Sequence, residues 1–128
     1  MGKYGQVAIF ATSLIQTQKA SSPLDAWNLA VSKFFPNSKS SQDKCCPKGA
    51  YLGLCEAGFI NKVKPGDYTR SKKNKYYAIK AVRILDQSKL VSYDDLSLWK
   101  LVLDGESKVL NGQMDVVLSL WHAGQIKV

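Results

Sequence analysis

The stretch TRSKKNKYYAIKAVRIL, residues 69–85, decides the fold that we expect for this chain. Apolar side chains recur in it at the spacing of a helix that buries one face. They are Tyr77, Ala78, Ala81, Val82, Ile84 and Leu85. The opposite face holds Lys72, Tyr76, Lys80 and Arg83. The stretch therefore predicts an amphipathic helix with a cationic outer face.

The start of this helix has charge of the unfavourable sign. A helix N-terminus carries about half a positive charge, so a lysine there forgoes or costs roughly 0.3–1 kcal/mol. Here Lys72, Lys73 and Lys75 occupy the first turn, directly after Arg70 and Ser71. Sequences often break a local rule where they function. We therefore expect a negative group from another molecule in front of Ser71 and Lys72.

Two helices are predicted before this stretch at the N-terminal end of the chain. Apolar residues at helical spacing indicate the first helix over residues 3–19. Ser22, Pro23 and Asp25 supply a cap, a first-turn proline and a first-turn acid, so the second helix begins there. This helix is expected to stop before Pro36.

A polar segment and a third helix follow. The segment NSKSSQDK, residues 37–44, is rich in turn formers and predicts a loop. The third helix is expected to run from Pro47 to Ala57, with Gly58 at its C-cap. Since the basic helix comes next, it is the fourth.

The C-terminal part predicts two further helices. Ser92, with Asp94 and Asp95, indicates the start of a fifth helix that ends at Gly105. Asn111 is the expected cap of a sixth helix, although its apolar run VVLSLW, residues 116–121, leaves a strand open as the alternative. We therefore expect an all-α fold, with residues 1–128 forming one compact domain of five or six short helices. Its 45% apolar content suffices for one core, where we expect the three tryptophans Trp27, Trp99 and Trp121.

One sequence pattern occurs twice. LGLCEAGFI at residues 52–60 aligns with LSLWHAGQI at residues 118–126. Two copies are too few for a solenoid, which needs about three repeats. We interpret the pattern as one glycine-terminated helix end used twice, with Ile60 and Ile126 each beneath its own helix.

Positive charge is unevenly spread along the chain. The net charge is +8, and residues 1–91 hold fifteen Lys and Arg against five Asp and Glu. The segment from residue 62 to residue 83 holds one acid, Asp67. Its candidate anion-binding residues are Lys62, Lys64, Arg70, Ser71, Lys72, Lys73, Lys75, Tyr76, Lys80 and Arg83. Lysine and arginine bind phosphates without regard to sequence, and Tyr68 or Tyr76 is placed to stack on a base.

The charge pattern predicts a non-catalytic binding protein, with nucleic acid as the leading ligand and an acidic protein as the alternative partner. A solvated lysine face is the plainer interpretation.

A standard helix-turn-helix is disfavoured, because about a dozen residues separate Gly58 from Ser71 where that motif has roughly 3 to 4.

Enzymatic chemistry has weak support in the sequence. There is no glycine-rich phosphate loop, nucleophile elbow or HExxH motif. Cys46 lies near a helix N-terminus, which lowers thiol pKa values in other proteins, and His122 is the one histidine that a Cys-dependent enzyme would use as base. Zinc held by Cys45, Cys46, Cys55 and His122 is weaker still, because no C-x2-C pair exists. We expect no catalytic residue, no cofactor and no metal.

An interaction module is the third class of function. Tyr4, Ile9, Phe10, Phe59 and Leu98 are the apolar residues that a small core is least able to cover. An exposed patch of this kind would imply a protein partner or a homodimer.

The cysteine count and hydropathy bear on the compartment. Three cysteines are an odd number, which favours a reducing environment, so we expect a cytoplasmic protein. The run VAIFATSLI, residues 7–15, is followed by no convincing cleavage site, and no apolar stretch approaches the roughly 20 residues of a membrane span.

Three stretches resemble a known family. They are SSQDKCCPKGAYLGLCEAGFI at residues 40–60, PGDYTRSKKNKYYAIKAV at residues 65–82 and QMDVVLSLWHAGQI at residues 113–126. Together they resemble an uncharacterised family of small bacterial proteins, a domain of unknown function loosely associated with mobile gene cassettes. The resemblance implies a small helical fold and no particular activity.

Overall fold

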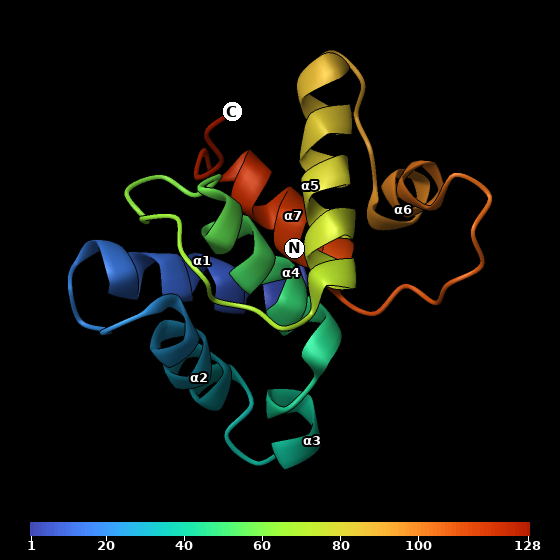
Figure 1. Cartoon of the computed structure of the whole chain (residues 1–128). Helices are drawn as coiled ribbons and strands as arrows, with labels where there is room; N and C mark the ends of the chain where they lie inside the picture. The colour runs from blue at the N-terminus through green and yellow to red at the C-terminus, as the bar shows by residue number, and fades with distance from the viewer.

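The computed structural model describes every residue from Met1 to Val128 and contains helices but no β-strand. The helices are α1 (Lys3–Gln16), α2 (Pro23–Phe34), α3 (Lys39–Gln42), α4 (Cys45–Ala57), α5 (Lys72–Gln87), α6 (Asp95–Leu103) and α7 (Gln113–His122) (Figure 1). The predicted all-α fold is confirmed. Six of the helices correspond to the six that the sequence predicts, and α3 is a single turn inside the expected loop at residues 37–44.

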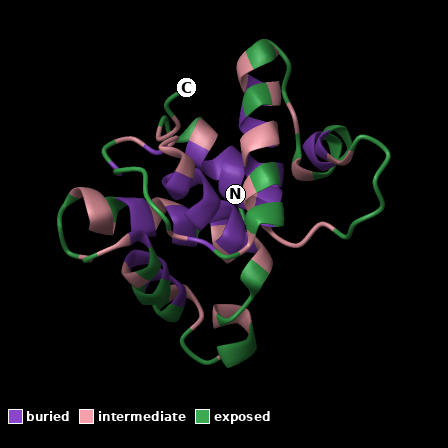
Figure 2. Ribbon diagram, in the orientation of Figure 1, coloured by how far each residue is buried: buried purple, intermediate pink, exposed green.

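Helix α4 lies at the centre of the molecule and packs against both α5 and α7 (Figures 1 and 2). Nine of its thirteen residues are buried, which only a helix surrounded by others allows. Gly53 explains how closely α5 approaches, because a Cβ atom at this position would lie 2.5 Å from the Cα of Lys75. A side chain there would force the two backbones apart.

Helices α1 and α2 form a pair, and α1 also packs against α7. The predicted start of α2 is confirmed, since the Ser22 hydroxyl accepts a hydrogen bond from the backbone N–H of Asp25. Helix α1 ends at Gln16, three residues earlier than predicted. The chain leaves the helix there because Gln18 has a φ of 59° and the N–H groups of Lys19 and Ala20 both donate to the Leu14 carbonyl.

The starts of the last two helices differ in detail from the prediction. Asp94, not Ser92, caps α6, in a reciprocal capping box with Ser97. Gly112, not Asn111, is the N-cap of α7, and its φ of 84° is one that side chains disfavour and glycine adopts freely. Residues 116–121 lie within α7, so the alternative strand is excluded.

The repeated sequence pattern produces the same helix end twice. After α4 the Phe59 N–H donates to the Leu54 carbonyl, and after α7 the Gln125 N–H donates to the Leu120 carbonyl, both at 3.0 Å. The two ends are not separate, however. Ile60 and Ile126 pair in an isolated antiparallel bridge, flanked by hydrogen bonds from Asn61 N–H to the Gln125 carbonyl and from Lys127 N–H to the Phe59 carbonyl, each 2.9 Å. The two isoleucines therefore also join the two helix ends to each other, which the repeated pattern did not predict.

A single core of 27 buried hydrophobic residues joins all the helices except α3 (Figure 2). Trp27 and Trp99 lie inside it, whereas Trp121 is half-buried at its edge. None of the helices combines the length and the apolar character that crossing a membrane requires.

Candidate anion-binding surface

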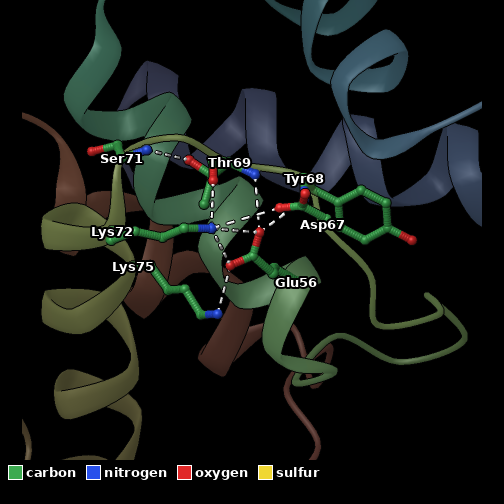
Figure 3. Close-up of polar contacts among 7 residues, drawn as sticks. All are labelled: Glu56, Asp67, Tyr68, Thr69, Ser71, Lys72 and Lys75. Carbon is green, nitrogen blue, oxygen red and sulfur yellow. Dashed lines mark hydrogen bonds and ion pairs between the residues drawn. The ribbon is translucent and has the colours of Figure 1, made fainter.

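The centre of the basic segment is a buried carboxylate that the sequence analysis did not single out. Glu56 lies in the last turn of α4, and its side chain is only 6% exposed (Figure 3). The ammonium of Lys72 donates to both of its oxygens, at 2.9 and 3.2 Å, and the ammonium of Lys75 also donates to Oε2. The backbone N–H groups of Tyr68 and Thr69 donate to Oε1 at 2.8 and 3.1 Å. Glu56 therefore connects α4, the segment before α5 and the first turn of α5.

The charge of Glu56 is well stabilised at this position. Burial by itself raises the pKa of a carboxyl group. The hydrogen bonds from Lys75 and Lys72 and from the two backbone N–H groups outweigh that effect, and they hold the pKa of Glu56 far below its usual range. Glu56 is consequently a carboxylate at every physiological pH.

This arrangement overturns the expectation that another molecule must neutralise the first turn of α5. Glu56 neutralises Lys72 and Lys75 from within the chain, and Lys72 also lies 3.7 Å from Asp67. Lys73 pairs with Glu106 at 3.2 Å. Glu56 occupies the C-terminal turn of α4, where a negative charge is as unfavourable as lysine is at a helix start. The two misplaced charges offset each other.

The Lys73 contact belongs to a small cluster at the side of α5. The Tyr77 hydroxyl donates to the Glu106 carboxylate at 2.7 Å. Hydrogen bonds from Tyr77 and Lys73 lower the pKa of Glu106, and burial opposes them. The cluster attaches the segment after α6 to the first turns of α5.

Five of the predicted cations have no carboxylate partner within 4.0 Å: Lys62, Lys64, Arg70, Lys80 and Arg83. Lys80 and Arg83 lie on the outward face of α5 together with Tyr76, whose side chain is exposed. These three residues and Lys72 share one side of α5, as the helical spacing predicts; Lys72, Tyr76 and Arg83 are exposed and Lys80 is half-buried.

The structure does not gather all ten predicted residues into one site. Lys62 and Lys64 belong to the loop after α4, beside the end of α7, because neighbouring Asn61 donates to the Gly124 carbonyl. Arg70 and Ser71 line a cavity near the start of α4. Lys72, Lys73, Lys75, Tyr76, Lys80 and Arg83 are on α5. The Ser71 hydroxyl makes no capping bond to the α5 backbone and instead accepts a hydrogen bond from the Asn74 side chain at 2.8 Å.

The cysteines and the histidine do not form one site. Burial raises the pKa of Cys46, and the neighbouring Cys45 thiol raises it further, which is opposite to the effect expected at a helix N-terminus. Burial raises the pKa of Cys55 to about 12. Cys46 and His122 line different cavities. No group of three or more His, Cys, Asp and Glu side chains is arranged to hold a metal ion.

A cavity of about 460 Å³ lies between the N-terminus, the start of α6 and helix α7. The carboxylates that line it have structural roles. Asp115 accepts hydrogen bonds from the N–H groups of Gly2 and Gly5, at 2.9 and 2.8 Å. Asp94 caps α6. Burial raises the pKa of Asp95, and Asp115 and Asp94 add to that effect. Three carboxylates therefore line this cavity, together with the N-terminal residue Met1 and His122.

The comparison with protein families covers almost the entire chain. A family model described as a family of unknown function, DUF6979, matches residues 1–127. The chain belongs to this family. The match to DUF6979 includes α1 and α2, which precede the three stretches that resemble the family. The family is therefore defined by the whole helical domain. No curated protein and no solved structure matches this DUF6979 chain.

Proposed function

We propose that this protein is a non-catalytic binding protein that holds nucleic acid on the outward face of α5. The observation that carries the proposal is that Lys80 and Arg83 have no carboxylate partner in the chain, although both lie beside the exposed Tyr76. Two free cations and an aromatic ring are the elements that bind a single strand without sequence preference.

The spacing of these residues fits a polyanion. Tyr76, Lys80 and Arg83 follow one another at helical intervals of four and three residues, so they extend over roughly 10 Å of the α5 surface. That length corresponds to about three nucleotides at roughly 3.4 Å per nucleotide. Lys73 flanks the same face, and its exposed ion pair with Glu106 is of the kind that contributes little, so phosphates compete for this ammonium group.

The net charge of +8 supports the proposal in a second way. It draws polyanions toward the protein from a distance and raises the association rate at low ionic strength. The charge does not specify a sequence, so the ligand class is nucleic acid in general, with an acidic protein segment as the alternative.

The test is a titration of a fluorescently labelled single-stranded oligonucleotide, followed by anisotropy at about 20 and about 200 mM salt. The variant Lys80→Glu/Arg83→Glu is compared with Lys19→Glu/Lys33→Glu, which changes the net charge equally but lies outside the basic segment. We expect the first variant to bind roughly tenfold more weakly than the second and to show a shallower salt dependence. Equal weakening by both variants, or affinity that is indifferent to salt, would contradict the proposal.

Exposed apolar residues favour a protein interaction as a second candidate function. Leu98 is buried and Tyr4, Ile9, Phe10 and Phe59 are half-buried, so none of the side chains expected to be uncovered is fully exposed. Five of the ten exposed large apolar side chains are instead on α6 or on the segments that precede and follow it: Leu90, Val91, Leu96, Leu101 and Val109. A homodimer through this region predicts a concentration-dependent mass in light scattering, and Leu96→Asp would abolish it.

We further propose a cytoplasmic location, because the three cysteines form no disulfide bond. A bacterial origin and an association with mobile gene cassettes remain predictions from the family resemblance.

A further inference from the structure

A cavity of about 390 Å³ lies between the start of α2, the first turns of α4 and the segment before α5. Its volume is within the roughly 300–1,000 Å³ of small-molecule sites. It is separate from the outward face of α5, since none of Tyr76, Lys80 and Arg83 contributes to its walls.

The lining of this cavity combines two kinds of residue. Leu24 of α2 and Leu52 of α4 provide apolar surface, and Tyr68 contributes to the wall as well. Lys48 and Arg70 provide positive charge, and no Asp or Glu is among the lining residues. The cavity thus offers both apolar and cationic groups to an occupant.

The two cations are not used by the protein itself. Neither Lys48 nor Arg70 has a carboxylate within 4.0 Å. This distinguishes them from Lys72 and Lys75, which Glu56 holds. Their charges are available to a ligand.

The wall that carries Arg70 is held in place before any ligand binds. The N–H groups of Tyr68 and Thr69 donate to Glu56, and the Ser71 N–H donates to the Thr69 hydroxyl at 3.0 Å. Gly49 lets this wall approach α4, because a Cβ atom there would lie 2.9 Å from the Cβ of Ser71. A preformed wall loses little conformational entropy on binding.

Leu24 provides exposed apolar surface at the mouth of the cavity. It lies in the first turn of α2 and is 43% exposed, and Leu29 of the same helix is 48% exposed but does not line the cavity. A ligand with an apolar body would cover Leu24, and an anionic group on that ligand would reach Lys48 and Arg70.

We propose that this cavity binds a small anion with an apolar body, such as a phosphate or carboxylate attached to an aromatic or aliphatic group. The occupant is a small molecule and not a polymer, because the volume holds a single compact ligand. The proposal does not depend on nucleic-acid binding by α5. The larger acidic cavity beside Asp94, Asp95 and Asp115 has the opposite charge and serves as an internal contrast.

The test uses the fluorescent probe 8-anilinonaphthalene-1-sulfonate, which joins an apolar body to one anionic group. Its uncharged analogue N-phenyl-1-naphthylamine has the same body without the sulfonate. We expect saturable binding of one sulfonate probe per chain and at least fivefold weaker binding of the uncharged analogue, about 1 kcal/mol. Near-ultraviolet circular dichroism and a cooperative melt exclude binding to a partly unfolded state.

Two variants with matched controls locate the site. Leu24→Asp places a carboxylate in the cavity, whereas Leu29→Asp makes the same change at a 48% exposed position of α2 that does not line it. Lys48→Ala is compared with Lys33→Ala, which also lies outside the cavity. We expect the cavity variants to weaken probe binding roughly tenfold relative to their controls, about 1.4 kcal/mol. Equal effects of variant and control would overturn the proposal.

Competition identifies the source of the anionic group. Displacement of the probe by adenosine monophosphate supports a phosphate ligand, and displacement by octanoate supports a carboxylate ligand. Displacement by neither would show adventitious dye binding and overturn the proposal. Because Leu24 and Lys48 are not on α5, their variants leave oligonucleotide affinity at the level of their controls, while Lys80→Glu/Arg83→Glu leaves probe binding intact. The two proposals therefore fail independently.

Discussion

The Glu56 carboxylate in the last turn of α4 lies 2.9 Å from the Lys72 ammonium in the first turn of α5. Each charge alone opposes the dipole of its own helix. Placed together, they stabilise the contact between the two helices and fix the segment that joins them, since the same carboxylate accepts two backbone N–H groups.

The first prediction is that Glu56→Gln destabilises the fold by about 2 kcal/mol, because hydrogen bonds to a charged group each contribute roughly 1.5–3 kcal/mol and the amide keeps only part of them. Glu106→Gln is the control, since that carboxylate is more exposed, and it should shift the unfolding midpoint much less. Urea unfolding of both variants measures the difference. An equal shift would show that burial of Glu56 adds nothing to its ion pairs.

The same substitution tests the link between the ion pairs and anion binding. Glu56→Gln releases Lys72 and Lys75 from their carboxylate partner, so oligonucleotide affinity should rise by roughly threefold to tenfold at low salt. Anisotropy titration at a temperature where the variant is folded provides the measurement. Unchanged or weaker binding would mean that these two ammonium groups do not contribute to the binding surface.

Stability should fall on acidification because of Glu56. Its pKa is lowered in the folded protein, so its contribution is fully present above the unfolded value near 4.5 and is lost as the pH falls below that value. Between neutral pH and pH 5 the urea midpoint should therefore lose nothing through this group. Below about pH 4.5 the wild-type midpoint should fall more steeply than that of Glu56→Gln. Parallel curves would assign the acid sensitivity to Asp94 and Glu106, whose pKa values are also lowered.

Gly53→Ala should destabilise the protein by about 1–3 kcal/mol, although alanine is the better helix former. The added Cβ would lie 2.5 Å from the Lys75 backbone, so α4 and α5 must separate. Asn28→Ala, at an exposed position of α2, reports the gain in helix propensity without any clash. Thermal unfolding followed by circular dichroism distinguishes the two, and a stabilised Gly53→Ala protein would refute the close approach.

Thiol reactivity tests whether Cys46 is a nucleophile. Its raised pKa predicts that iodoacetamide modifies it more slowly than a free cysteine at neutral pH. Cys55 should react only after unfolding, since burial raises its pKa to about 12. Mass spectrometry of the modified peptides follows each site. Rapid modification of Cys46 would return the Cys-dependent enzyme to consideration.

The sequence predicted the helices well because their start and stop signals are local. Ser22 with Pro23 fixed the start of α2, and Gly58 fixed the end of α4. Asn111 was the wrong cap because the adjacent Gly112 adopts a backbone conformation that a side chain disfavours, and helical periodicity contains no such information.

The candidate site was predicted only in part because its partners are distant in sequence. Spacing alone placed Tyr76, Lys80 and Arg83 on the outward face of α5. Glu56 precedes Lys72 by sixteen residues, and no periodic pattern connects them. A local signal did exist, since Glu56 is an acid in a C-terminal helix turn and therefore breaks the same dipole rule as the lysines. No sequence pattern indicated that Lys48 lines a cavity, because the cavity forms where α2 and the segment before α5 meet.

The bridge between Ile60 and Ile126 bears on how the protein folds during synthesis. The end of α4 lacks its backbone partner until residue 127 has been added and has left the ribosome. Helices α1 and α4 are made early, but part of their apolar surface also awaits α7, against which both pack. We therefore expect the native packing to form only after α7 and the residues that follow it have been made, because contacts between such distant residues form only when the intervening chain is present.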